Sequence, residues 1–215
     1  MAAGRLAELP IFPLESVLLP DEQLPLRIFE PRYVALVNDC LRAENLRFGV
    51  VLISRGREVG GGDARYDVGV LARIAECVDI GSGRYALRCE MGERFRVGDW
   101  LPDNPYPRAA VRLWPDEPGP AVTEQQLRAI DDRVLALFER VAVASDAPPP
   151  GRDEVLGRQR PRDTGKRLFA LASLLPLGPA DRYAVLSAPS AAARLAALTE
   201  ALDGVAAMIE FQLFE

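Results

Sequence analysis

The 215-residue chain contains no histidine. Hydrolases built on Ser-His-Asp or Cys-His groups are therefore excluded, as are metal sites that need an imidazole ligand. Only three cysteines occur, Cys40, Cys77 and Cys89, and no two have the C-x-x-C spacing. Neither a disulfide framework nor a zinc site follows from them. We expect no metal and no cofactor.

Long apolar runs are also missing. No segment approaches the ~20 apolar residues that span a bilayer, and the first residues lack the basic and apolar regions of a secretory signal. We therefore expect a cytoplasmic protein with no membrane partner. The formal net charge of −5 argues against nucleic acid as a partner, because phosphate binding needs a concentrated positive face.

The first part of the chain, residues 1–120, is predicted to be rich in strands. Short apolar runs alternate there with Gly, Pro and Asp, and many short strands of this kind are typical of a barrel. One helix is expected to begin at Pro31, where apolar residues repeat at helical spacing. The candidate strands are Glu8–Leu14, Val17–Leu19, Leu24–Phe29, Phe48–Ser54, Val68–Ile80, Arg84–Met91, Phe95–Leu101 and Arg108–Trp114.

A hairpin is predicted around Ser82 and Gly83. A two-residue loop would pair Ile80 with Tyr85, Val78 with Leu87, Glu76 with Cys89 and Ile74 with Met91. This register places Cys77 on the opposite face from Cys89, so free thiols are expected rather than a disulfide.

The second part, residues 121–215, is predicted to be helical. Thr123 and Gln126 fit a capping box, and an apolar stripe follows at helical spacing. Further helices are expected over Lys166–Leu175, over Ala180–Leu186 and after Ser190, which can cap the last one. Residues 145–165 contain three consecutive prolines and many charges, so we expect a mobile loop there.

Two possible catalytic motifs are incomplete. A phosphate-binding loop ending at Gly165-Lys166 would need glycine at position 160 and Ser or Thr at 167, but both positions hold arginine. A serine-lysine dyad of Lys166 with Ser190 has no local support, and a helix cap explains Ser190. We therefore expect no Walker A site, no Ser-Lys site and no enzyme activity.

Glu76 is the most plausible acid–base group, because it falls on the apolar face of the predicted hairpin. A structural role is favoured, in which Glu76 lies at the rim of the barrel or pairs with an arginine such as Arg73 or Arg88. A carboxylate-based hydrolase remains an alternative.

The opening segment resembles the N-terminal substrate-binding domain of Lon proteases. The resemblance begins with LPIFPL and VLLP and ends with LPLRIFEPRY at residues 24–33. Later segments agree with it, namely FGVV at 48–51, EVG at 58–60, VGV at 68–70, GRY at 83–85 and RFRV at 94–97. The resemblance implies an α+β fold, with a PUA-like barrel followed by a helical subdomain.

The resemblance also implies non-catalytic binding of peptides or unfolded protein segments. Lon proteases continue into ATPase and Ser-Lys peptidase domains, whereas this chain ends after its helices, so we do not carry proteolysis over. The role would be that of an adaptor, a chaperone-like factor or a modulator of a separate protease or chaperone. The binding candidates are Leu18, Leu19, Arg27, Phe29, Arg32 and Tyr33. For Phe12, Phe29 and Tyr33, packing in the core is favoured over contact with a ligand.

RNA binding is a further alternative, because PUA-like barrels include RNA-binding relatives. The acidic balance of the chain argues against it. A local patch formed by Arg55, Arg57 and Arg65 would override that balance.

Overall fold

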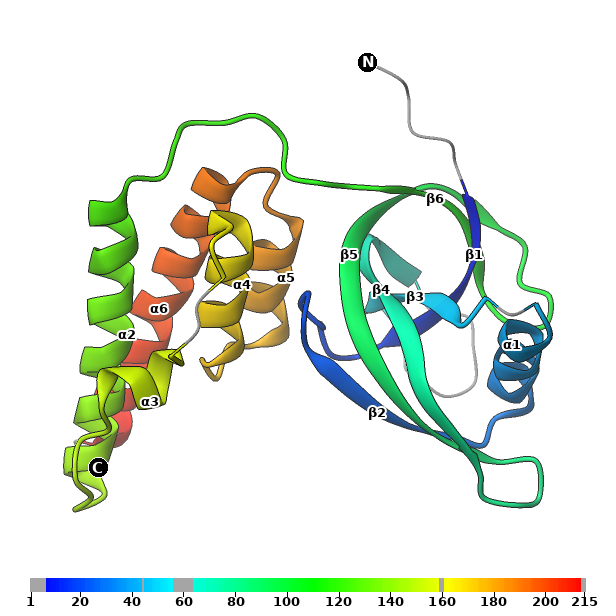
Figure 1. Ribbon diagram of the computed structural model, residues 1–215, viewed down its shortest axis with the longest axis horizontal. Helices are drawn as coiled ribbons and strands as arrows, with labels where there is room; N and C mark the ends of the chain where they lie inside the picture. Colours follow the sequence, from blue (N-terminus) through cyan, green and yellow to red (C-terminus); the bar gives the residue numbers. More distant parts are fainter. Residues whose placement is uncertain (1–6, 44, 56–63, 159–160, 214–215) are drawn as a thin grey trace. The chain divides into compact units, whose positions relative to one another are not determined.

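The computed structural model describes residues 7–43, 45–55, 64–158 and 161–213. Within it the chain forms two compact units, Met1–Pro115 and Asp116–Glu215, and each is described by itself. The first contains the sheet and one helix, and the second contains only helices (Figure 1). The α+β class expected from the sequence is confirmed. Among the described residues, no helix has the length and apolar character that crossing a membrane requires.

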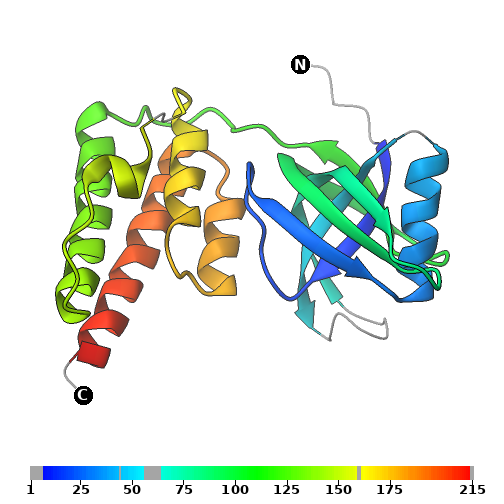
Figure 2. The ribbon, with the colours of Figure 1, turned by 60° about the horizontal axis from the view of Figure 1, so that its bottom comes forward.

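Six strands of the first unit form one sheet in the order β2-β5-β4-β3-β1-β6. An additional β5–β6 pairing closes a ring of five strands, β5-β4-β3-β1-β6, as a barrel requires. Figure 2 shows these strands curving around the unit. The strands are β1 (Ala7–Leu14), β2 (Gln23–Ile28), β3 (Arg47–Arg55), β4 (Ala64–Asp79), β5 (Tyr85–Leu101) and β6 (Arg108–Leu113).

Two strand predictions differ from the structure. Residues Val17–Leu19 form no strand, although Val17 and Leu19 are buried. The two strands expected over Arg84–Met91 and Phe95–Leu101 are a single long strand, β5. An apolar segment that is buried without a strand partner gives the same sequence pattern as a short strand.

The predicted hairpin register is wrong. The observed pairs are Asp79 with Tyr85, Cys77 with Leu87 and Ile74 with Cys89, and the register shifts between Ile74 and Glu76. The loop is longer than two residues, because Gly81, Ser82 and Gly83 all have positive φ and Ile80 N donates to Arg84 O. Only the tertiary structure shows this bulge, which moves side chains beyond it to the other face.

Because the observed register pairs Cys77 with Leu87, Cys77 lies on the same face as Cys89, contrary to the prediction. All three cysteines are nevertheless free thiols, as expected. Burial raises the pKa of Cys89 to about 12 and that of Cys40 to about 11. Desolvation also raises the pKa of Cys77, which is only partly buried.

These thiols are expected to react in a fixed order, because the thiolate is the nucleophile and an alkylating reagent must reach it. At pH 8 in the native protein, Cys77 should be alkylated first, and Cys40 and Cys89 only after unfolding. Mass spectrometry of the alkylated peptides measures the order in which the three thiols react. Labelling of Cys89 before Cys77 would contradict this prediction.

The raised pKa values of Cys40 and Cys89 also predict that the stability of the protein falls as the pH rises from about 9 toward 11–12, because these thiols lose their protons first in the unfolded chain.

Helix α1 (Pro31–Arg42) begins at Pro31, as the sequence predicts. Proline suits the first helical turn because the N–H that it lacks has no partner within the helix. Tyr33, Leu36, Val37 and Cys40 form its buried stripe. Figure 2 shows α1 packed beside the strands.

The second unit contains five helices in its described residues. They are α2 (Glu124–Ala144), α3 (Arg152–Leu156), α4 (Thr164–Ser173), α5 (Pro179–Ser187) and α6 (Ala191–Leu213). Thr123 and Gln126 form the predicted capping box at the start of α2. Ser190 caps α6, because its hydroxyl oxygen accepts from Ala193 N at 3.3 Å.

Helices α2 and α6 run side by side in the same direction (Figures 1 and 2). Exposed ion pairs join Arg133 to Asp203 and Arg140 to Glu210, one heptad apart on both helices.

The segment 145–165, where a loop was expected, contains helix α3. Gly151 precedes this helix, and the side chain of Glu154 caps it by accepting a hydrogen bond from Gly151 N. Arg152 forms ion pairs with Asp131 and Asp132 of α2. Five residues with one buried apolar side chain, Val155, give too weak a periodic pattern to identify a helix from sequence.

Candidate functional site

Three of the six predicted binding residues line one pocket in the first unit. They are Arg27 in β2, Phe29 directly after it and Tyr33 in the first turn of α1. The pocket has a volume of about 230 Å³. Its full lining is Phe12, Leu14, Pro25, Leu26, Arg27, Ile28, Phe29, Glu30 and Tyr33. Strands β1 and β2 and the start of α1 therefore contribute together.

Aromatic rings form the buried wall of this pocket. The ring centroids of Phe12 and Tyr33 lie 4.2 Å apart, and the ring of Phe48, which does not line the pocket, lies 6.1 Å from that of Phe12. Phe12 and Tyr33 are buried, as the sequence predicts. Phe29 is not: it is 60% exposed, so the prediction that it packs in the core is wrong. An exposed phenylalanine beside a pocket offers apolar surface to a guest.

Two charged residues, Arg27 and Glu30, line the pocket, whereas the predicted Arg32 does not. Arg32 Nε donates to Glu30 Oε2 at 3.2 Å, and its guanidinium lies 4.4 Å above the centre of the Tyr33 ring. Both side chains of this ion pair are less than one-fifth exposed. Arg32 therefore holds Tyr33 and Glu30 in place instead of projecting into solvent. Arg27 is exposed and, within the part of the chain that the structure describes, has no ion pair.

The remaining candidates, Leu18 and Leu19, do not line this pocket. Leu19 is fully buried, and its N–H donates to Glu22 Oε2 at 2.8 Å. Leu18 is half-buried in the segment between β1 and β2. Six lining residues were not among the predicted candidates, namely Phe12, Leu14, Pro25, Leu26, Ile28 and Glu30. Alternation of inward and outward side chains in β2 is the signal that could have found Ile28.

The pocket lies where two strand edges have no strand partner among the described residues. Strand β2 pairs only with β5. Strand β1 pairs with β6 along Ala7–Pro10 and with β3 along Ile11–Leu14, so its second half has β3 on one side only. Such edges can pair with an added extended chain.

The surroundings of Glu76 favour its ionised form, whereas a general acid must keep its proton. Its carboxylate bonds the guanidinium of Arg88 on the exposed face of the hairpin, as the structural interpretation of the sequence predicts. The hydrogen bond and charge of Arg88 lower the pKa of Glu76. A catalytic acid needs a raised pKa, so Glu76 gives the hydrolase alternative no support.

The arginine patch suggested for RNA has one member that is already engaged. Arg65 makes a bidentate contact with Asp103, at 3.0 and 3.2 Å, and lies 5.2 Å from the centre of the Trp100 ring. Arg57 lies outside the described residues. Asp103 neutralises Arg65, which leaves the exposed Arg55 as the other described member of the patch, and one arginine is not the concentrated positive face that phosphate binding needs.

The segment around Lys166 is the capped start of a helix. Lys166 N donates to Asp163 Oδ1 at 2.8 Å, so a carboxylate already occupies this helix N-terminus. Across the described residues, no group of three or more histidine, cysteine or acidic side chains is placed to hold a metal ion.

Comparison with known proteins gives one consistent family. The chain is 28% identical to Lon protease 2 of Myxococcus xanthus over 197 residues, covering 91% of this chain and 23% of that one. It is 33% identical to the Lon protease of Anaeromyxobacter dehalogenans over 132 residues, covering 60% of this chain and 16% of that one. The chain therefore spans a quarter or less of these two relatives.

Solved structures agree in fold. A Lon N-terminal domain protein from Xanthomonas campestris matches with a TM-score of 0.64 and 28% identity, covering 91% of this chain and 98% of that one. The N-terminal domain of the Mycobacterium avium complex Lon protease matches with a TM-score of 0.61 at 17% identity, covering 92% and 98%. The family model for the ATP-dependent protease La (LON) substrate-binding domain matches residues 8–204, and the chain belongs to this family.

Proposed function

We propose that this chain binds flexible, apolar segments of other proteins at the pocket between β1 and β2, and releases them uncut. The observation that carries the proposal is the pocket itself, in which a buried aromatic wall and the exposed Phe29 lie beside two strand edges. Membership in a substrate-binding family supports the same role.

The size of the pocket indicates what part of a guest it can hold. Pockets for drug-sized ligands are roughly 300–1,000 Å³, so about 230 Å³ suits one or two side chains of a longer segment. The rest of the guest would lie along the edge of β2 as an added strand. Pro25 lacks an N–H, so such a ladder would be interrupted there.

Affinity is expected in the micromolar range. Ordering a flexible segment costs about 2–5 kcal/mol, which offsets much of the apolar gain. The protein would then act as an adaptor, a chaperone-like factor or a modulator of a separate protease, and the bound segment would stay intact with or without ATP.

Phe29→Ser tests the role of the pocket. If a guest covers Phe29, its loss should weaken binding of an uncharged apolar peptide by roughly tenfold, since burying such a side chain contributes about 1.5–3 kcal/mol. Fluorescence anisotropy with a labelled peptide measures this, and chromatography of the recovered peptide checks that it is uncut.

Val143→Ser is the matched control, because Val143 is 73% exposed and lies in the other unit. It should leave the affinity unchanged. Equal weakening by both variants, an array of flexible apolar peptides without any binder, or cleavage of the peptide would refute the proposal.

A further inference from the structure

The outer face of the β4–β5 hairpin presents apolar side chains to solvent. Val78 is 56% exposed and Ile80 is 46% exposed, and neither lines the pocket described above. The ladder pairs Val78 with Ala86, and Ala86 with Arg27 of β2, so these three residues form a row across the sheet. In the next row, Ile80 N bonds Arg84 O. In each of these two rows an aliphatic side chain therefore shares the row with an arginine, Val78 with Arg27 and Ile80 with Arg84.

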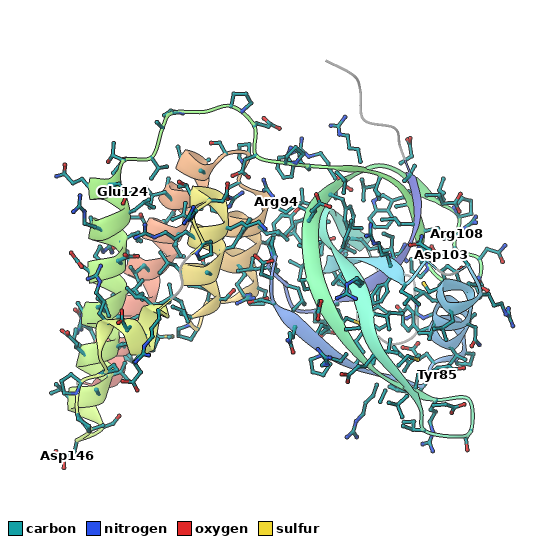
Figure 3. All side chains as sticks on the ribbon, in the orientation of Figure 1. Tyr85, Arg94, Asp103, Arg108, Glu124 and Asp146 are labelled. Atoms are coloured by element: carbon teal, nitrogen blue, oxygen red, sulfur yellow. The ribbon has the colours of Figure 1, made fainter. Side chains whose placement is uncertain are left out.

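The inner face of the same strands is different in kind. Ile74, Leu87 and Cys89 are buried there. Tyr85, at the start of β5 (labelled in Figure 3), donates its hydroxyl to Asn38 Oδ1 of α1 at 2.8 Å. The inner face therefore has its partner within the unit. Exposed aliphatic side chains on the other face of the same hairpin need a separate explanation.

Charge distinguishes this hairpin face, which we define as Val78, Ile80, Arg84, Ala86 and Arg88. Glu76 neutralises Arg88. Arg84 is exposed and donates its Nε–H to Gly81 O, and no described carboxylate forms an ion pair with it. The adjoining Arg27 is likewise without an ion pair among the described residues.

The face therefore carries excess positive charge in a protein whose net charge is −5. This excess is local, and it alternates with aliphatic groups. Such a surface complements a segment that carries both carboxylates and apolar side chains. Single-stranded nucleic acid binds instead to aromatic platforms in a positive groove, and Val78 and Ile80 offer no ring on which a base can stack.

We propose that the hairpin face docks an acidic, apolar-rich segment of a protein partner. The aliphatic residues Val78 and Ile80 contact its apolar side chains, and Arg84 with Arg27 pairs with its carboxylates. The five residues of the hairpin face do not line the pocket, although the adjoining Arg27 does. The proposal extends the proposed function by assigning a charge preference to a second contact. It does not depend on the pocket being correct.

Three fluorescent probes test the proposal on the full chain. They are a short peptide that alternates Leu or Phe with Asp or Glu, the same peptide with Lys at every acidic position, and an oligouridylate RNA. The acidic peptide should bind at least tenfold more tightly than its lysine counterpart, and added salt should weaken it. Arg84→Glu should weaken the acidic peptide by roughly tenfold, because repulsion replaces attraction. Val78→Ser should weaken it by a smaller factor.

Arg112→Glu is the matched control, since Arg112 is an exposed arginine on β6 of the same unit. It should leave binding of the acidic peptide unchanged. Arg84→Glu should also keep the affinity for an uncharged apolar peptide, which reports on the pocket and on folding. Equal binding of the two charged peptides, equal weakening by Arg84→Glu and Arg112→Glu, or binding of the RNA alone in an Arg84-dependent way would overturn the proposal.

Discussion

Asp116→Ala is expected to lower the free energy of unfolding of the helical unit by about 3 kcal/mol. Asp116 accepts two bonds from Arg194, at 2.5 and 2.9 Å, and the guanidinium of Arg194 lies 3.8 Å from the centre of the Phe169 ring. Arg194 is fully buried, whereas the Asp116 side chain is one-third exposed. Removing the carboxylate leaves a buried charge without its partner, which costs about 3–5 kcal/mol in general. We take the lower end because water can reach the vacated position.

Denaturant unfolding followed by far-ultraviolet circular dichroism measures this effect, since the helices of the second unit dominate that signal. Asp203→Ala is the control, because Asp203 pairs with Arg133 on the surface of the same unit and should contribute no more than about 1 kcal/mol. Combining Asp116→Ala with Arg194→Leu should restore much of the loss, because no buried charge remains. A loss for Asp116→Ala as small as that for Asp203→Ala would show that the buried pair does not stabilise the unit.

Gly69→Ala is expected to destabilise the barrel unit by about 1–3 kcal/mol or more. A methyl group at this position would overlap the carbonyl oxygen of Val50 and lie 2.7 Å from Phe95 Cζ. The carbonyl belongs to the neighbouring strand β3, so it cannot move without breaking the ladder. Phe95 is fully buried in the central cluster with Ile11 and Val111 and has no free space to move into.

Gly92→Ala separates this steric cause from the general effect of adding a methyl group to a strand. Its nearest neighbour would be the oxygen of Leu71 at 3.6 Å, which is ordinary contact. We expect a change within about 0.5 kcal/mol. Tryptophan fluorescence reports on unfolding, because Trp100 and Trp114 both lie in the first unit. If the two variants unfold at the same denaturant concentration, the packing argument at Gly69 fails.

Most elements were predictable because their patterns are local. Pro31 begins α1, Thr123 and Gln126 cap α2, and Ser190 caps α6, as the residue types require. The segment ending in FEPRY was enough to indicate the family, because the resemblance is spread over many residues and does not depend on any single position. Helix α3 was missed because its stabilising contacts, from Arg152 to Asp131 and Asp132, join residues far apart in sequence.

The candidate site was predictable in part. Arg27, Phe29 and Tyr33 line one pocket, whereas Leu18, Leu19 and Arg32 do not. An apolar segment has the same sequence pattern whether it faces a core or a pocket. The sequence therefore could not distinguish the burial of Leu19, which is complete, from that of Phe29, which is exposed. Neither residue lies in a strand, and packing against residues distant in sequence decides which of the two is buried.

The sequence by itself determined the absence of imidazole chemistry, the α+β class, the family and the starts of α1, α2 and α6, because each depends on residue identity or on contacts within a few positions. Only the tertiary structure decided the hairpin register, the face of Cys77 and the exposure of Val78 and Ile80. The longer loop and the register shift near Ile74 together set the face that each of these side chains takes, and both are defined only once the two strands are paired.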